Sequence, residues 1–417
     1  MTSTPAGDVR RDRSEAPWTA GLVEVLLVAA CMRPAITAVG PVLSRIGHSQ
    51  GLNHVALGLL SAMPLIAFAG VSPLVHRPAG RYGVERLILW ALLALTAGIV
   101  VRSVAGTAGL WLGTLVVGIG VAVCNVLMPV VVRSGYAARV ALVTGLYSSA
   151  LGVAAAAASG VALPLAGLAG GWRLSLGIWA VLTAGAAVVW GTRVRRRGRT
   201  TAEPVRAGSE GDRAAAADVR PERSVWRTGS AWRITAFMGL QSTSFYVLVS
   251  WFPAIAVDRG LSASLAGWYL FAAQVVGIFS GLALPLLLHR TSREVSAVAV
   301  SAPMALAVLG LVVAPAAMPL WVLCIGLSTG SALVLALSMI GLAARGSGHG
   351  AQLSGMAQAV GYGLAATGPV IAGYLRDATG SWDAALLVLL CVAVIQALVV
   401  IAPGREARVR RAGGRQR

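Results

Sequence analysis

The longest polar interruption of this chain reads RVRRRGRTTAEPVRAGSEGDRAAAADVRPERSVWRTGS (193–230). The segment is rich in arginine, glycine and alanine, and it holds too few large apolar residues to bury a core of its own. It therefore predicts a basic linker. On either side of it the chain is strongly apolar, and the two apolar parts are similar in length.

The apolar parts have the composition of a membrane protein. Of the 417 residues, 57% are hydrophobic and 12% are charged, whereas a soluble domain is about 45–50% apolar and about a quarter charged. This composition excludes a water-soluble enzyme, a disordered chain and a disulfide-rich secreted module. A membrane-spanning helix needs roughly 20 apolar residues, and the sequence contains twelve such runs. They cover residues 21–43, 54–75, 84–103, 109–131, 141–163, 172–192, 231–257, 264–288, 293–314, 319–343, 352–374 and 382–402.

All basic residues are arginines, and they are distributed unevenly between the two sides of the membrane. With the N-terminus inside, 28 of the 34 arginines lie in cytoplasmic segments, 5 lie in outer segments, and Arg33 lies within the first span. Because basic residues that flank spans concentrate in the cytoplasm, we expect a multi-pass protein of the cytoplasmic membrane with both termini inside. The net charge of +19 is then a topology signal, and nucleic acid is not an expected partner. The outer arginines are Arg45, Arg102, Arg173, Arg259 and Arg376.

The twelve spans group into two parallel halves. Landmarks recur at an offset of 209–212 residues, among them Pro41 with Pro253 and Trp172 with Trp382. Such a repeat indicates a duplicated six-helix unit. The expected organisation is a cytoplasmic N-tail (1–20), an N-terminal half (21–192), the linker (193–230), a C-terminal half (231–402) and a cytoplasmic C-tail (403–417).

Several strings are more specific. The first span contains CMRPAITAVGPVL (31–43), and the seventh contains QSTSFYVLVSWFP (241–253), followed by LAGWYL (265–270). The fifth span opens with TGLYSSALG (144–152), and the last outer loop reads RDATGSWD (376–383). With these strings the chain resembles the cyanate permease / 2-nitroimidazole transporter family within the major facilitator superfamily. The resemblance covers nearly the whole chain except the tails and the linker.

This resemblance implies an all-α integral membrane fold of twelve transmembrane helices in two six-helix halves. It also implies transport of small anionic or weakly acidic molecules and of small nitroaromatics. One loop departs from the general superfamily signature, since PLVHRPAGRYGVER (73–86) lacks the Asp found there. The family strings are therefore the stronger part of the resemblance.

Arg33 is the candidate centre of a substrate site. It lies near the middle of the first span, where an ionisable group costs about 2.5–3.5 kcal/mol. Its planar guanidinium suits a carboxylate or a similar small anion. Pro34 cannot donate to the carbonyl of Ala30, so we expect a kink there, and Thr37 shares the face of Arg33 one turn later. The alternative is a structural arginine that is paired with carbonyl groups.

Polar residues in other spans are candidate partners for the same ligand. The amides would supply neutral donors, and the tyrosines would line the cavity or stack on a flat ligand. For each of them the alternative is a hydrogen bond within the helix bundle. Spans three, six, nine and twelve are nearly free of such residues, which agrees with the peripheral place that the resemblance implies for them. The candidates are Asn125, Tyr147, Gln241, Tyr246, Gln274, Gln358 and Tyr362.

Two further residues have expected places. Glu24 is a carboxylate within the first span, but it lies about 13.5 Å along the helix from Arg33 and on the opposite face, so the two cannot pair. We expect an interfacial carboxylate rather than a proton carrier. Trp251 precedes the end of the seventh span and is expected to be an interfacial anchor, with a gate as the alternative.

No pattern in the sequence indicates a catalytic, cofactor or metal site, because the five His and four Cys lack ligand spacing. An enzyme is therefore not expected. We expect a secondary transporter of a small organic anion, embedded in the lipid bilayer and functional as a monomer. Two alternatives stay open, namely an exporter of neutral nitroheterocycles or drugs in which Arg33 is structural, and a membrane sensor of the same fold.

Overall fold

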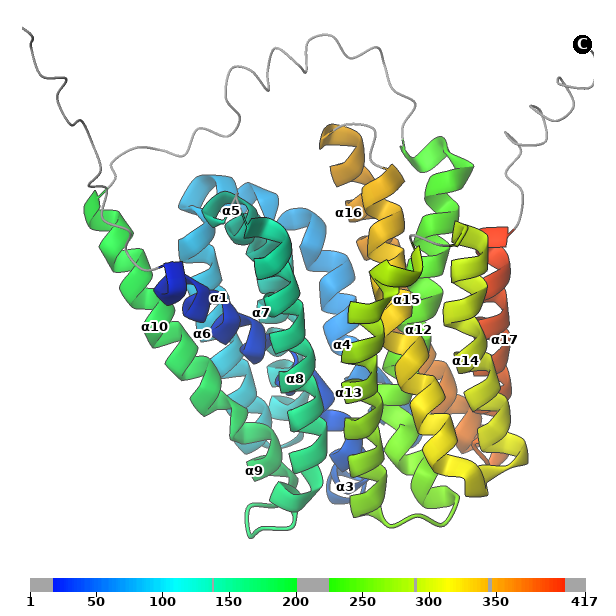
Figure 1. Cartoon of the computed structure of the whole chain (residues 1–417). Coiled ribbons are helices and arrows are strands. Elements are labelled where there is room, and N and C mark those ends of the chain that lie inside the picture. Colours follow the sequence, from blue (N-terminus) through cyan, green and yellow to red (C-terminus); the bar gives the residue numbers. More distant parts are fainter. Residues whose placement is uncertain (1–17, 137–138, 201–224, 289–290, 344–346, 402–417) are drawn as a thin grey trace, which may run out of the picture.

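The computed structural model describes residues 18–136, 139–200, 225–288, 291–343 and 347–401, and within these ranges it consists of helices joined by short connections (Figure 1). The central part of the expected linker (201–224), most of the N-tail and the C-tail lie outside the described residues. Two bundles of helices stand side by side, the first formed by helices before residue 200 and the second by helices after residue 225.

The N-terminal bundle contains the six spans expected there. The first and the sixth are each built from more than one helix, and a short helix follows the second span. Its elements are α1 (Trp18–Met32), α2 (Pro34–Thr37), α3 (Val39–Gln50), α4 (His54–Val71), α5 (His76–Tyr82), α6 (Val84–Val104), α7 (Gly106–Gly135), α8 (Val140–Ala166), α9 (Gly171–Gly177) and α10 (Trp179–Thr200).

The C-terminal bundle contains the other six spans, each as one continuous helix. These are α12 (Gly229–Asp258), α13 (Ala263–Leu288), α14 (Arg293–Val313), α15 (Met318–Ala343), α16 (Ser347–Thr379) and α17 (Asp383–Ile401).

The prediction of twelve spans is confirmed in its main features. Among the described residues, ten helices are long and apolar enough to cross a membrane, and the bent first span is an eleventh. The twelfth is α16, whose glycines and polar residues make it less apolar than the others. Helix α16 packs against α4 and α12, so a large part of its surface is covered by other helices.

Glycines bring helices close together at several crossings. In the C-terminal half, a Cβ on Gly330 of α15 would collide with the carbonyl of Gly277 in α13. Between the halves, a Cβ on Gly40 would collide with the carbonyl of Val249, and one on Gly58 with the carbonyl of Pro369. Small residues permit such backbone contact, and here they join the two halves directly.

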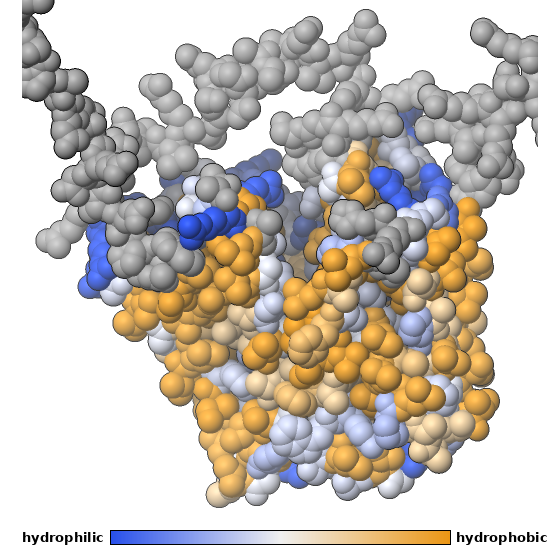
Figure 2. Space-filling view, in the orientation of Figure 1, coloured by the Kyte–Doolittle hydropathy of each residue, from blue (hydrophilic) through white to orange (hydrophobic). Residues whose placement is uncertain are grey.

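The two halves meet at one end of the molecule and separate at the other. They contact each other around α3 and the start of α4, and they diverge toward the end that carries α5 (Figure 1). The surface shows a gap between the halves at that second end and a broad apolar band around the sides (Figure 2). We call the two ends the closed end and the open end. The arginine distribution predicts that the open end is cytoplasmic.

Candidate functional site

The first span carries the candidate centre of the site and is not a continuous helix. Helix α1 ends at Met32 and α2 begins at Pro34, so that Arg33 lies at the interruption. The span then bends by 41° where α2 meets α3. The interruption agrees with the effect expected of Pro34, but the larger bend lies one turn further along the chain.

Two residues account for that larger bend. Pro41 has no N–H to donate to the carbonyl of Thr37, and the hydroxyl of Ser159 in α8 donates to this carbonyl instead, at 3.2 Å. The hydroxyl of Thr37 in turn donates to the carbonyl of Ala155 in α8, at 3.0 Å. The bend is therefore fastened to α8. Thr37 uses its hydroxyl proton inside the bundle, and a substrate contact by Thr37 stays a prediction.

The guanidinium of Arg33 faces the other half of the molecule. It lies over the ring of Phe245 in α12, with 5.5 Å between the guanidinium carbon and the ring centroid. Its side chain is only partly buried. In the part of the chain that the structure describes, the guanidinium makes no hydrogen bond and has no carboxylate partner.

Aromatic side chains from both halves surround Arg33. Tyr147 of α8 and Tyr246 of α12 belong to one buried cluster, and Phe245 and Tyr362, the latter from α16, pack against it. The ring of Tyr362 packs edge-on against Phe68 of α4, at 5.3 Å between centroids, which brings the two halves into contact beside Arg33. The structure thus brings the three predicted tyrosines together. We call Phe68, Tyr147, Phe245, Tyr246 and Tyr362 the central aromatic cluster.

Sequence reasoning missed the two phenylalanines of this cluster. An apolar ring in an apolar span carries no polarity signal, so only its position can reveal it. Phe245 directly precedes Tyr246 in the string QSTSFY, and the two rings contact each other at 5.0 Å between centroids.

Two of the predicted amides are engaged within their own helices. The amide nitrogen of Gln241 donates to the hydroxyl of Ser242 at 2.7 Å and to the carbonyl of Met238 at 3.2 Å. That of Gln358 donates to the hydroxyl of Ser354 at 3.1 Å. In this conformation their donors are used for local hydrogen bonds, and substrate contacts by them stay predictions.

The other two amides have different surroundings. The amide nitrogen of Gln274 in α13 donates to the hydroxyl of Ser159 in α8 at 2.6 Å, so it links the two halves. Asn125 in α7 is half-buried, and its amide makes no hydrogen bond within the described part of the chain. Of the predicted amides, Asn125 is therefore the one whose donors are unused.

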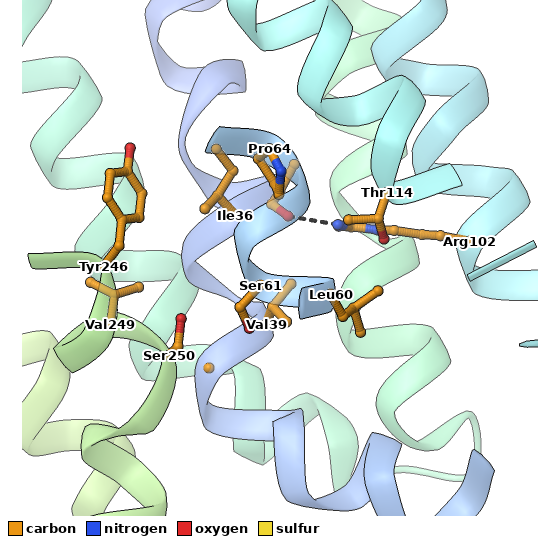
Figure 3. Close-up of a pocket in the computed structure, with 12 residues that line it drawn as sticks. Ile36, Val39, Leu60, Ser61, Pro64, Arg102, Thr114, Tyr246, Val249 and Ser250 are labelled. Carbon is orange, nitrogen blue, oxygen red and sulfur yellow. Dashed lines mark hydrogen bonds between the residues drawn. The ribbon is translucent and has the colours of Figure 1, made fainter. Parts of the chain in front are cut away.

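Arg102 differs most from its expected place. The arginine distribution assigns it to an outer segment, but it lies in the last turn of α6 and is only 1% exposed. One guanidinium nitrogen, Nη1, donates to the carbonyl of Ala35 in α2 at 2.6 Å. Arg102 lines a cavity of about 10 Å³ between the halves (Figure 3). Ser61, Thr114, Tyr246 and Ser250 supply the other polar groups of this cavity.

The closed end is held by a cluster of polar and aromatic contacts. His54, at the start of α4, lies 2.5 Å from a carboxylate oxygen of Asp377 in α16. The indole of Trp251 is buried beside His54, and its N–H donates to the carbonyl of Pro369 at 2.9 Å. The expectation of an interfacial anchor at Trp251 is therefore wrong, because the ring is enclosed where the two halves meet.

Glu24 lies away from Arg33, as its spacing predicts. Its carboxylate accepts a hydrogen bond from Arg193 of α10 at 2.7 Å, and Arg193 also donates to Glu85 of α6 at 3.1 Å. These three residues tie α1, α6 and α10 together. Among the residues that the structure describes, no group of His, Cys, Asp and Glu is arranged to hold a metal ion.

Comparison with known proteins establishes the family. A family model described as the Major Facilitator Superfamily matches residues 25–366. The chain belongs to this superfamily. It is therefore a multi-pass membrane transporter and not an enzyme, and the resemblance inferred from the sequence strings is confirmed.

Named relatives of the superfamily cover nearly the full chain. This protein is 35% identical over 387 residues to the 2-nitroimidazole transporter of Escherichia coli (strain K12), which covers 93% of this chain and 95% of the relative. It is 25% identical over 368 residues to the cyanate transport protein CynX of the same organism, with 87% and 91% covered. Among solved structures, a bacterial homolog of the human lysosomal transporter Spinster, inward-facing and unoccupied, matches with a TM-score of 0.70 at 16% identity over 92% of this chain and 96% of that chain. That likeness shows the fold.

Proposed function

We propose that this transporter moves a small organic anion or weak acid across the cytoplasmic membrane by alternating access, with Arg33 as the central contact. One observation carries the proposal. Arg33 lies between the two halves at mid-span and has neither a carboxylate partner nor a hydrogen bond among the described residues. A cation in that position is costly, and a bound anion would neutralise it.

The named relatives support the same ligand chemistry. One is named for cyanate, a small anion, and the other for 2-nitroimidazole, a flat heterocycle. Arg33 offers two parallel donors to an anionic group, while the central aromatic cluster offers flat apolar faces to a ring. A planar weak acid would use both parts of the site.

The second candidate function is export of a neutral nitroheterocycle. The observation that favours it is the central aromatic cluster, because five rings from four helices pack together beside Arg33. In that case Arg33 would serve to hold Phe245 in place by a cation–π contact, worth about 0.5–2 kcal/mol.

The gap between the halves at the α5 end fits exchange of a ligand with the cytoplasm. If the open end is cytoplasmic, this conformation gives a ligand access to Arg33 from inside, and the contacts between Gly40 and Val249 close the path to the outside. Alternating access then requires these contacts to separate and the halves to approach each other at the α5 end.

The test is to compare ligand binding and uptake in the native protein and in Arg33→Gln. Purified protein is titrated with cyanate, benzoate and 2-nitroimidazole while its thermal stability is followed, and uptake of each compound is measured in proteoliposomes. A ligand at 100 times its dissociation constant stabilises by about 2.7 kcal/mol. We expect Arg33→Gln to weaken binding of the anions by about 10- to 150-fold, which corresponds to one charge-assisted hydrogen-bonded pair of about 1.5–3 kcal/mol.

Arg45→Gln is the matched control, because Arg45 is an exposed arginine of the same span that donates to the carbonyl of Ala166. It should bind and transport as the native protein does. Normal anion transport by Arg33→Gln would reject the site. Stabilisation by 2-nitroimidazole alone, equal in both proteins, would favour the exporter. Binding without uptake would favour a sensor.

A further inference from the structure

Arg102 is a second cation without a counter-charge among the described residues, and unlike Arg33 it is fully buried. Its Nη1 donates to the carbonyl of Ala35, but Nε and Nη2 have no hydrogen-bond partner in the described structure, although both atoms are fully buried. Breaking or omitting the partner of a buried charge costs about 3–5 kcal/mol. A guanidinium that only had to hold one carbonyl would not need these two donors.

The two unpaired nitrogens share one edge of the guanidinium. Nε–H and one N–H of Nη2 point in parallel directions, which is the arrangement that binds two oxygens of a carboxylate. The hydroxyl of Ser61, also lining this cavity, is buried without a hydrogen-bond partner as well. Unpaired donors from α4 and α6 thus lie around one small space (Figure 3).

The cavity lies between the site of Arg33 and the closed end. Its walls include Ala35, Gly40 and Tyr246, and the ring of Tyr246 contacts Phe245, over which the guanidinium of Arg33 lies. Gly40 belongs to the backbone contact with Val249 that joins the halves. A volume of about 10 Å³ holds about one water molecule, so an anion fits here only after the halves have separated at this end.

We propose that Arg102, with Ser61, forms a second binding site for small carboxylate-like anions, which is occupied when the closed end opens. The site receives the anion from the side opposite to the α5 end and passes it along α2 to Arg33. This inference rests on the proposed function, because it assumes an anionic substrate. The inference assigns to Arg102 a contact with the anion that forms only in the conformation in which the closed end is open.

The test uses a variant that cannot close at this end. A Cβ on Gly373 would collide with the backbone carbonyl of His54 at the closed end, so Gly373→Trp should hold the halves apart there, away from the cavity. Binding of benzoate and cyanate is measured by calorimetry in the native protein and in Gly373→Trp, each with and without Arg102→Gln. We expect Arg102→Gln to weaken binding at least tenfold in the Gly373→Trp background and less than twofold in the native background.

Three outcomes separate the explanations. Equal weakening in both backgrounds would overturn the proposal and leave Arg102 as the residue that positions α2. No weakening in either background would also overturn it. If Arg33→Gln binds normally while Arg102→Gln shows the expected difference, the central site at Arg33 fails and the second site stands.

A second variant covers the case in which Arg102→Gln does not fold. Ser61→Ala removes one hydroxyl and almost no volume. It should weaken benzoate binding about threefold in the Gly373→Trp background and leave the native background unchanged. An unchanged affinity in both backgrounds would count against the proposal.

Discussion

Three arginines of the N-terminal half show how differently a membrane protein can hold a charge. Arg193 has two carboxylates, Glu24 and Glu85. Arg102 has one carbonyl, and Arg33 has an aromatic ring. The charge of Arg193 is neutralised by the fold itself, so its role is structural. The other two charges are not neutralised by described groups, which is why both are assigned to ligand binding.

The pairing of Glu24 leads to a prediction for Glu24→Gln. The variant should lose about 1.5 kcal/mol of stability, the lower value for a charged hydrogen bond, because Arg193 keeps Glu85. Uptake driven by a pH gradient should stay within about twofold of native. Thermal unfolding and proteoliposome uptake check this. A stable variant that no longer responds to the pH gradient would instead make Glu24 the proton carrier.

The residue scale also shows what the sequence can and cannot predict about the site. Arg33 and the three tyrosines are predicted because polar groups in apolar spans are rare, and the structure brings them together, while substrate binding by them stays a prediction. The orientation of the side-chain amides of Gln241 and Gln358 cannot be predicted in this way. Helical periodicity gives the face of a residue and not the rotamer that turns its amide toward its own helix. Arg102 was misplaced because a charge near the end of an apolar run gives the same pattern whether it faces the core or the solvent.

At the scale of elements, α4 and α16 form the contact that closes one end. The carboxylate of Asp377 accepts hydrogen bonds from His54 and from the backbone N–H of Val55. Partial burial raises the pKa of Asp377, but these hydrogen bonds outweigh it and leave the pKa below its ordinary value. The contact therefore stabilises the closed end at pH values above the ordinary pKa of an aspartate. This stabilisation is lost as the pH falls through the lowered pKa of Asp377.

Asp377→Asn should weaken closure without unfolding the protein. A partly exposed pair of this kind contributes about 0.2–1 kcal/mol, so the open population at this end should rise about 1.4- to 5-fold. The measurement is labelling of Ser250→Cys by a membrane-impermeant thiol reagent from outside, in a Cys391→Ser background, since Cys391 is the exposed cysteine among the described residues.

The matched control is Asp258→Asn. Asp258 pairs with Arg376 at 3.0 Å, and both residues belong to the C-terminal half. Its loss should therefore leave the labelling of Ser250→Cys unchanged. If both variants increase labelling equally, the contact between the halves does not depend on the pair of His54 and Asp377.

The elements also show where sequence reasoning is strong. The count of apolar runs predicts all twelve spans. In the structure, eleven of them are long and apolar enough to cross a membrane, and α16 is the more polar twelfth. The bend of the first span was placed at Pro34, but the larger one is caused by Pro41 together with Ser159. Ser159 is far away in the sequence, so a hydrogen bond from it to the carbonyl of Thr37 is not visible in the local pattern.

At the scale of the whole molecule, the two halves meet through backbone contacts at glycines. Gly373→Trp should therefore abolish transport while the protein still folds and binds its ligand, because one end can no longer close. Proteoliposome uptake and calorimetry check the two parts of this prediction. Gly185→Trp is the control, since Gly185 lies exposed on α10 with open space around it. Transport by Gly373→Trp at the rate of this control would contradict alternating access through this contact.

Which end is closed could not be predicted from the sequence. The two conformations of such a transporter use the same helices and the same orientation signals, and they differ by only a few kcal/mol. Apolar runs and arginine counts are identical in both. The contacts of Gly40, Gly58 and Gly373 distinguish them only once the halves have been placed together.

The bend between α2 and α3 makes the outer part of the first span a lever. Helix α3 has 12 residues and is therefore about 18 Å long, and its fulcrum is fixed to α8 by the hydrogen bonds at Thr37 and Ser159. A rotation of about 10° at the fulcrum would move the tip by about 3 Å, the width of a water molecule, and would have to release Arg45 from the carbonyl of Ala166 in α8. Hydration of the closed end can thus precede any displacement of the ligand.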